Sequence, residues 1–344
     1  MNLEQPCIRI SVRNLVEFIL RHGDIDNRTG GADKEAMQQG GRIHRKIQRQ
    51  QGAEYRAEVS LKYQIACDGF ILSVEGRADG IIELPKRVVI DEIKGVFKDL
   101  KRLKEPQLLH LAQAKCYAYI YAEQKNLEEI GVQMTYCNSD TEETRRFQEV
   151  YTRAELKKWF EELVSEYEKW ARYQMEWRAK RNASIKTVEF PFEYRDGQKK
   201  LVASVYRTIL RKKKLFIQAP TGVGKTMAAV FPAVKAVGEE LGEKIFYLTA
   251  KTITRTVASQ AFEILRNQDL KMKVITLTAK EKICFCEEME CNPDACPYAK
   301  GHFDRVNDAM YDLLTTADDM DRSTLEEQAK KHRVCPFELS LDLS

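Results

Sequence analysis

The sequence contains no long apolar run. None of its 344 residues belongs to a stretch that approaches the roughly 18 consecutive apolar residues of a membrane span, which excludes a helical membrane protein. The N-terminal residues do not combine a basic head with an apolar core, so a secretory signal peptide is not indicated. We therefore expect a cytoplasmic protein that has no membrane partner.

A large net charge and a disulfide pattern are absent too. The 56 lysines and arginines nearly balance the 52 aspartates and glutamates, so local basic patches, and not a global field, would have to hold a nucleic acid. The nine cysteines, an odd number, are expected to stay reduced in the cytoplasm, which favours metal binding or simple burial over disulfides. At about 150 residues per domain, the length predicts two compact units.

The N-terminal third is predicted to begin with a helix and to continue as strands. Residues 33–51 suit a helix, and a strand-rich block follows over residues 56–96. Two apolar runs inside this block, joined at residues 84–86 (Leu-Pro-Lys), predict a β-hairpin. The first part of the chain is therefore expected to form a mixed α/β domain.

Two carboxylates and an ammonium are expected to converge at this hairpin. The period of two places Glu92 and Lys94 on one face of the second strand, and closure of the hairpin brings Asp79 close to both. Carboxylate oxygens suit Mg²⁺ or Mn²⁺, which stabilises the charge on a phosphodiester under attack by water, and Lys94 would orient or help deprotonate that water. Asp91 competes with Glu92 in sequence but projects to the opposite face. The alternative interpretation is a charged hairpin end with a solvated lysine.

The order of these residues resembles the PD-(D/E)xK nucleases of the RecB type. "GRADG" supplies the aspartate, "DEIK" supplies the E-x-K element, and "QAKCY" on a following helix supplies a Q-x-x-x-Y element. His44 in "GGRIH" matches an upstream metal ligand of that group. The resemblance covers roughly residues 33–138 and implies a restriction-endonuclease-like α/β domain. It implies catalytic roles for Asp79, Glu92, Lys94, Gln113 and Tyr117, and binding of Mg²⁺ or Mn²⁺ by His44, Asp79 and Glu92.

A long helix is predicted over residues 152–182. Apolar residues at spacings of three and four form a stripe along it, and all three tryptophans of the chain belong to it, which favours core packing over a base-stacking platform. Small and polar residues and a proline then break the pattern and place a boundary near Asn182. Before this boundary, four cysteines lack the triplet of CRISPR-associated nucleases and are interpreted as buried apolar residues: Cys7, Cys67, Cys116 and Cys137.

After the boundary, "KLFIQAPTGVGKTMAAV" predicts a strand at residues 215–218, a glycine-bearing turn and a helix. Gly222 and Gly224 would let backbone N–H groups approach a polyphosphate at the positive end of that helix. Lys225 would reach the β and γ phosphates of ATP, and Thr226 would offer a hydroxyl to Mg²⁺. The stretch therefore predicts a nucleotide site.

Ala219 replaces the first glycine of the general phosphate-binding motif, and the string A-x-x-G-x-G-K-T resembles the superfamily-2 helicases. The resemblance implies that Gln198 reads adenine. It also implies a second strand at residues 245–249, after which Lys251 and Arg255 contact the backbone of DNA. Single-stranded DNA is the implied main partner, and a monomer is the expected state. The implied ATP-binding residues are Gln198, Ala219, Pro220, Thr221, Gly222, Val223, Gly224, Lys225 and Thr226.

A second group of cysteines follows in "KEKICFCEEMECNPDACPYAKGH" and "HRVCPFELS". Four thiolates suit a [4Fe-4S] cluster, and zinc is the alternative that the sequence leaves open. The spacing of these cysteines and their position after the second predicted strand resemble those in the XPD/DinG helicases. The resemblance implies an iron-sulfur insertion. Cys286 could substitute for Cys284, and His302 is not expected to be a ligand. The implied ligands are Cys284, Cys291, Cys296 and Cys335.

A Walker B carboxylate pair, which a helicase needs together with a second lobe, is not found after Lys225. We therefore expect a fragment of a longer protein that binds ATP without turning it over. The leading hypothesis is the N-terminal part of an ATP-dependent DNA helicase fused to a metal-dependent nuclease, acting on single-stranded or forked DNA in repair. A non-cleaving DNA clamp and a zinc-binding interaction module are the alternatives. The predicted segments are the nuclease-like domain (1–150), a linking helix (151–182), the first part of a RecA-like lobe (183–278) and the iron-sulfur insertion (279–344).

Overall fold

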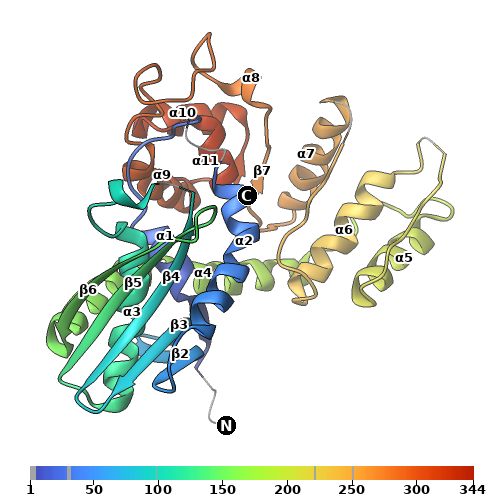
Figure 1. Cartoon of the computed structure of the whole chain (residues 1–344). Helices are drawn as coiled ribbons and strands as arrows, with labels where there is room; N and C mark the ends of the chain where they lie inside the picture. Colours follow the sequence, from blue (N-terminus) through green and yellow to red (C-terminus); the bar gives the residue numbers. More distant parts are fainter. Residues whose placement is uncertain (1–4, 29–31, 98, 221, 250–251) are drawn as a thin grey trace. The chain divides into compact units, whose positions relative to one another are not determined.

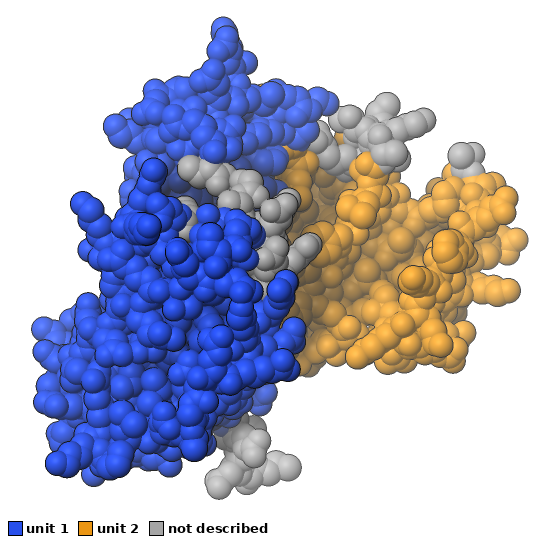
Figure 2. Space-filling model, viewed as in Figure 1, with its two compact units in different colours: residues 1–172, 279–311, 326–342 blue, residues 173–278, 312–325, 343–344 orange. Residues whose placement is uncertain are grey.

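The structure is a computed structural model that describes residues 5–28, 32–97, 99–220, 222–249 and 252–344. The chain forms two compact units (Figure 2). The predicted division into four segments stays a prediction, because a compact unit is defined by packing alone. The first unit contains Met1–Arg172, Ala279–Tyr311 and Glu326–Asp342, and the second contains Tyr173–Thr278, Asp312–Leu325 and Leu343–Ser344.

A mixed six-stranded sheet forms the centre of the first unit (Figure 1). Its strand order is β1-β3-β4-β5-β6, and β2 pairs along β3 as an additional neighbour. β3 and β4 form the predicted hairpin, in which Leu84 pairs with Arg87 across a two-residue turn. The strands are β1 (Cys7–Ser11), β2 (Tyr55–Cys67), β3 (Phe70–Leu84), β4 (Arg87–Val96), β5 (Glu129–Asn138) and β6 (Thr144–Thr152).

Two helices pack on the sheet next to β4. The parallel pair β4–β5 needs a crossover connection, which α3 (Leu108–Lys125) supplies as it packs on both strands (Figure 1). α2 (Ala32–Arg49) corresponds to the helix predicted at residues 33–51. Its Ile43 and Ile47 pack against Ile93 of β4 and Cys137 of β5. α1 (Val12–Ile19) and the short 3-10 helix η1 (Leu100–Arg102) complete this part.

The long helix α4 (Arg153–Thr187) begins at a reciprocal cap. Glu155 N donates to Thr152 Oγ1 at 3.2 Å, and Thr152 N donates to the Glu155 carboxylate at 2.9 Å. Within the first unit Trp170 is buried, with its ring 4.8 Å from that of Phe18 and 5.1 Å from that of Tyr311, which confirms core packing at this position.

Among the described residues, no helix combines the length and the apolar character that crossing a membrane requires.

The four scattered cysteines differ in exposure. Cys116 on α3 and Cys137 on β5 are buried, as predicted, and Cys67 at the end of β2 is partly exposed. The prediction is wrong for Cys7, which is exposed. Cys7 is the first residue of β1, an edge strand that pairs with β3 alone, and side chains at such an edge remain open to solvent.

The first unit also contains the cysteine-rich segment, which is attached through residues 21–28, here called the strap. Ile25 N donates to the Ala299 carbonyl at 3.0 Å, and Asn27 N donates to the Cys291 carbonyl at 2.9 Å. Side chains add polar contacts between Arg21 and Asp342, between Asp24 and the Gly301 N–H, and between Arg28 and Asp294. The helices of this part of the chain are α8 (Lys280–Ile283), α9 (His302–Thr316), α10 (Arg322–His332) and α11 (Pro336–Asp342), and the end of α9 and the start of α10 belong to the second unit.

The second unit consists mainly of helices. Besides the last part of α4 it contains α5 (Gln198–Leu210), α6 (Lys225–Gly238), α7 (Thr252–Arg266) and a short parallel pair of β7 (Val274–Ile275) and β8 (Asp319–Met320). Apolar residues of α6 and α7 form its core, with Val230 and Val234 facing Phe262 and Leu265 in one buried cluster.

The predictions of strands at residues 215–218 and 245–249 are wrong, because neither segment forms a strand in the structure. Phe216 is 93% exposed and Leu248 is 88% exposed. A central parallel strand is held by hydrogen bonds from neighbouring strands and is covered on both faces. In the part of the chain that is described, neither segment has such a neighbour. An apolar sequence alone is therefore not enough to form these strands.

Candidate functional site

The hairpin places three of the predicted residues where its hydrogen-bond ladder opens. The paired register of β3 and β4 ends at Gly80 and Asp91. Just beyond it, Asp79 Oδ2 accepts a hydrogen bond from Ile93 N at 2.8 Å, in place of a ladder carbonyl. Glu92 and Lys94 follow on β4, so the opening holds Asp79 next to both.

Lys94 is fixed by two partners. Its Nζ donates to Glu92 Oε1 at 2.8 Å and to Gln113 Oε1 on α3, also at 2.8 Å. Tyr117 lies one turn further along α3, is buried, and hydrogen-bonds to the backbone of Arg77. Burial raises the pKa of the Tyr117 hydroxyl, and the charge of Glu92 adds to this effect. The structure thus brings the predicted hairpin residues and the predicted Q-x-x-x-Y residues together.

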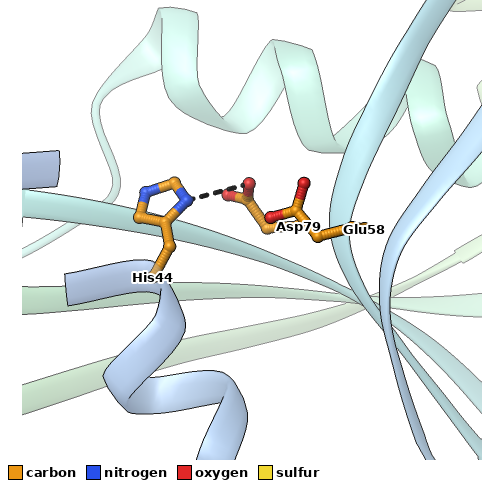
Figure 3. A group of neighbouring side chains, drawn as sticks. All are labelled: His44, Glu58 and Asp79. Atoms are coloured by element: carbon orange, nitrogen blue, oxygen red, sulfur yellow. Dashed lines mark ion pairs between the residues drawn. The ribbon is translucent and has the colours of Figure 1, made fainter. Parts of the chain in front are cut away.

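His44 joins this group from α2. Its Nδ1 lies 3.1 Å from Asp79 Oδ1, as the dashed line in Figure 3 marks. Burial opposes the charged form of the imidazole, but the hydrogen bond and the charge of Asp79 outweigh burial, so the pKa of His44 is raised. The packing of Ile43 and Ile47 against the sheet fixes α2 in the orientation that presents His44.

Glu92 is the most perturbed acid of the group. Burial raises its pKa to about 7, and the neighbouring charge of Asp79 adds to this rise, while Lys94 opposes it. Its Oε1 is bound by Lys94, but its Oε2 is buried and has no hydrogen-bond partner among the described residues. A buried oxygen acceptor without a partner is costly unless a donor or a cation satisfies it.

Glu58 on β2 is a site residue that the sequence did not reveal. It is an exposed residue with φ of +57°, and its position on β2 is opposite Asp79 on β3. Its carboxylate accepts from Arg77 Nε at 2.6 Å and from Gln48 Nε2 at 3.0 Å. Figure 3 shows it beside Asp79 and His44. Only the register of β2 against β3 brings it close to Asp79, so no local pattern in the sequence could have identified it.

The donor chemistry fits a divalent cation. One ligand atom each from His44, Glu58 and Asp79 can be chosen so that all lie within 4.8 Å of one another, and the partnerless Oε2 of Glu92 is a fourth candidate. Carboxylate oxygens with an imidazole nitrogen suit Mn²⁺ and, with added water ligands, Mg²⁺. The residues present therefore fit the metal that the resemblance implies.

In the second unit, the loop before α6 turns sharply at two glycines. Gly222 has φ of +86° and Gly224 has φ of +74°, values that L-residues rarely adopt. α6 begins at Lys225, whose Nζ donates to the carbonyls of Ala219 at 2.9 Å and Pro220 at 2.7 Å. The loop thus curls around its own lysine at a helix N-terminus. Binding of ATP by these residues, with Val223 and Thr226, stays a prediction.

Gln198 at the start of α5 supports this loop. It is buried, its Oε1 accepts from Arg195 N at 3.1 Å, and its Nε2 donates to the Gly224 carbonyl at 3.4 Å. Adenine recognition by Gln198 stays a prediction. Thr221 and Lys251 lie outside the described residues, and so does the side chain of Arg255 on α7.

The cysteine-rich segment contains two neighbouring thiol groups and a third that caps a helix. Cys286 Sγ lies 3.7 Å from Cys296 Sγ. Burial, followed by the thiols of Cys296 and Cys284, raises the pKa of Cys286 to about 11. Cys335 precedes α11 and receives hydrogen bonds from backbone N–H groups of that helix, yet burial raises its pKa to about 11. Cys291 is buried and is hydrogen-bonded by Lys280.

His302 accepts a hydrogen bond from the backbone of one of these cysteines. It is fully buried, and its Nδ1 accepts from Cys335 N at 3.1 Å. Burial lowers the pKa of His302 to about 4, so the ring is neutral near pH 7. Whether Cys284 or Cys286 would be the first ligand of a cluster stays open, since both lie close to Cys296 or to one another.

Comparison with protein families divides the chain in two. Residues 15–184 match the PD-(D/E)XK nuclease superfamily, and residues 197–289 match the DEAD/DEAH box helicases. The chain is thus a mixed α/β protein with a PD-(D/E)XK nuclease-like domain and a DEAD helicase (RecA-like) portion.

Two curated helicases resemble parts of the chain. The probable ATP-dependent helicase MJ0942 of Methanocaldococcus jannaschii is 31% identical over 121 residues, which are 35% of this chain and 18% of that protein. The regulator of telomere elongation helicase 1 of Homo sapiens is 22% identical over 209 residues, which match 46% of this chain and 17% of that protein. The chain therefore spans less than a fifth of each relative.

Two solved structures show weaker likeness. The crystal structure of SSO0001 superposes with a TM-score of 0.31 at 22% identity and covers 46% of this chain and 75% of that chain. An alkaline exonuclease (LHK-Exo) from Laribacter hongkongensis gives a TM-score of 0.29 at 12% identity, with coverage of 49% and 94%. Likeness at such TM-scores does not establish a shared fold.

Proposed function

We propose that the chain belongs to an ATP-dependent DNA helicase that carries a metal-dependent nuclease, and that the nuclease cleaves single-stranded or forked DNA. The observation that carries the nuclease assignment is the convergence of His44, Asp79, Glu92 and Lys94 around a buried carboxylate oxygen of Glu92 that lacks a hydrogen-bond partner in the described part of the chain. A solvated hairpin end, the alternative interpretation, would leave Lys94 extended in water, whereas it bridges Glu92 and Gln113.

The residues of the site have separable tasks in this proposal. A divalent cation held by His44, Glu58, Asp79 and Glu92 would supply positive charge to the phosphodiester. Lys94 stands beside that position and would orient the attacking water. Gln113 holds the ammonium of Lys94 in one rotamer, which avoids reorganisation during the reaction. Burial of Glu92 strengthens these electrostatic contacts because little water competes.

The helicase part of the proposal rests on the loop before α6. The turns at Gly222 and Gly224 direct the chain into α6, whose N-terminal N–H groups suit an anion. Lys225 is exposed, and the partners of its ammonium among the described residues are the neutral carbonyls of Ala219 and Pro220, which phosphate oxygens of ATP can replace. The loop before α6 does not by itself account for translocation along DNA.

For the cysteine-rich segment we infer a [4Fe-4S] cluster bound by Cys291, Cys296, Cys335 and either Cys284 or Cys286, as in the XPD/DinG helicases. Support comes from the five free cysteines of this segment, all of which lie in the first unit. Metal analysis of anaerobically purified protein separates the alternatives, because iron with acid-labile sulfide supports the cluster and stoichiometric zinc contradicts it.

The nuclease proposal is tested with a matched pair of lysine variants. Lys94→Ala removes the partly buried site lysine, and Lys86→Ala changes an exposed lysine in the turn of the same hairpin. Cleavage of a labelled single-stranded oligodeoxynucleotide in Mn²⁺ should fall at least about a hundredfold in Lys94→Ala and remain in Lys86→Ala. DNA binding without cleavage by the wild-type chain, in either Mg²⁺ or Mn²⁺, would instead identify a clamp.

A further inference from the structure

His110 lies one turn before Gln113 on α3. Residues 110, 113 and 117 are spaced by three and four positions, so they share the helix face that Gln113 and Tyr117 present to the site. Of these three residues, His110 is the one that is only partly buried and thus accessible from solvent. Its function is not explained by the nuclease motif.

Two strand residues hold His110 and Gln113 side by side. Lys94 on β4 and Tyr136 on β5 are partners in the parallel register, so their side chains project from the same face. Lys94 Nζ donates to Gln113 Oε1 at 2.8 Å, and Tyr136 OH lies 3.2 Å from His110 Nδ1. His110 therefore occupies the position along α3 that is next to the site lysine.

Hydrogen bonds around Tyr136 favour one tautomer of His110. Gln107 N donates to Tyr136 OH at 3.0 Å, and the hydroxyl uses both its acceptor and its donor when its own proton is given to His110 Nδ1, 3.2 Å away. An imidazole that accepts at Nδ1 carries its own proton on Nε2. Burial, with the charges of Lys94 and Arg13, lowers the pKa of His110 to about 3. The ring is therefore a neutral donor near pH 7.

We propose that the Nε2–H of His110 binds a non-bridging phosphate oxygen of the DNA strand, at the phosphate adjoining the one that faces Lys94. This inference rests on the proposed nuclease function and extends it to a substrate contact. A neutral N–H donor with the cations Lys94 and Arg13 nearby suits an anion, and such contacts position a strand without reading its sequence.

The test uses four variants and two separate measurements. His110→Phe keeps a ring but removes the donor, His110→Gln restores an N–H at a similar reach, and Tyr136→Phe removes the hydroxyl that fixes the tautomer. His22→Phe, at an exposed histidine of the same unit, is the control. Affinity for a fluorescent single-stranded oligodeoxynucleotide is measured in Ca²⁺, and cleavage is measured in Mn²⁺. Thermal melting shows whether each variant is folded.

We expect kcat/KM for cleavage and the affinity in Ca²⁺ to fall about ten- to a hundredfold in His110→Phe, the range for a hydrogen bond to a charged group. His110→Gln should recover most of this loss, and Tyr136→Phe should show a smaller loss of a few-fold. The salt dependence of binding should be unchanged in His110→Phe, because no cation is removed.

The proposal is overturned if folded His110→Phe binds and cleaves like wild type, or if His110→Gln is as impaired as His110→Phe. The first result excludes a substrate contact, and the second indicates a packing role for the ring. Should His110→Phe fail to fold, His110→Gln and Tyr136→Phe decide: wild-type affinity in Tyr136→Phe contradicts the tautomer argument. If wild type does not cleave, the nuclease proposal fails alone, because the affinity measurement in Ca²⁺ still tests the phosphate contact.

Discussion

The candidate nuclease site and the glycine-bearing loop before α6 are held together in different ways. The first collects His44, Glu58, Asp79, Glu92 and Gln113 from α2, β2, β3, β4 and α3. The second consists of consecutive residues between Ala219 and Thr226, shaped by two glycines and the start of one helix. The candidate nuclease site therefore depends on sheet register and helix packing. The loop depends on the backbone conformation of neighbouring residues, and it forms although residues 215–218 are not a strand.

Asp79→Asn is expected to have the largest effect and to change one activity without the other. The amide can still accept the hydrogen bond of Ile93 N, but it removes one of the charges that would bind the cation. Cleavage in Mn²⁺ should drop at least about a hundredfold, since a metal contributes several kcal/mol to charge stabilisation. Binding of a fluorescent ATP analogue should be unchanged. Parallel loss of both activities would show that the sites are not independent.

An intermediate effect is expected from Arg21→Ala, which tests whether the strap makes the cysteine-rich segment part of the nuclease unit. Arg21 is 15% exposed and pairs with Asp342 at 3.0 Å. Its loss leaves a half-buried carboxylate, which should reduce the free energy of unfolding by about 2 kcal/mol. Arg56→Ala breaks an exposed pair with Glu83 and should cost less than about 1 kcal/mol. Urea unfolding followed by tryptophan fluorescence measures both, and equal effects would contradict a docked segment.

The smallest effect is expected from Gly224→Ala. Alanine would be strained at φ of +74°, by about 1–2 kcal/mol. Its Cβ would also lie 2.4 Å from Gln198 Nε2, which therefore has to move. Affinity for the ATP analogue should fall about tenfold, while cleavage in Mn²⁺ stays at the wild-type rate. Gly242→Ala, where an added Cβ meets no atom within 4 Å and the backbone is unstrained, is the control and should bind like wild type.

Sequence reasoning succeeded where the determining interactions are local. The period of two along β4 placed Glu92 and Lys94 on one side and Asp91 on the other, and Asp91 indeed bonds to Thr135 and Gln133 away from them. The hairpin turn was equally local, because Leu84 and Arg87 are near neighbours in the chain.

The remaining features depend on partners far away in sequence. Glu58 could not be recognised, because only the register of β2 against β3 brings it to Asp79. The strap contacts join residues 21–28 to residues beyond 290, and no local pattern encodes them. The strands expected at residues 215–218 and 245–249 failed for the same reason, since an apolar segment becomes a strand only when other strands bind it.

The central claim is that the partnerless oxygen of Glu92, with Asp79, Glu58 and His44, binds a divalent cation. Mn²⁺ binding followed by electron paramagnetic resonance tests it without any need for cleavage. The account predicts one Mn²⁺ bound in the first unit of the wild-type chain, at least tenfold weaker binding in Asp79→Asn, and normal binding in the exposed control Asp68→Asn. Equal Mn²⁺ affinity in wild type and Asp79→Asn would contradict it.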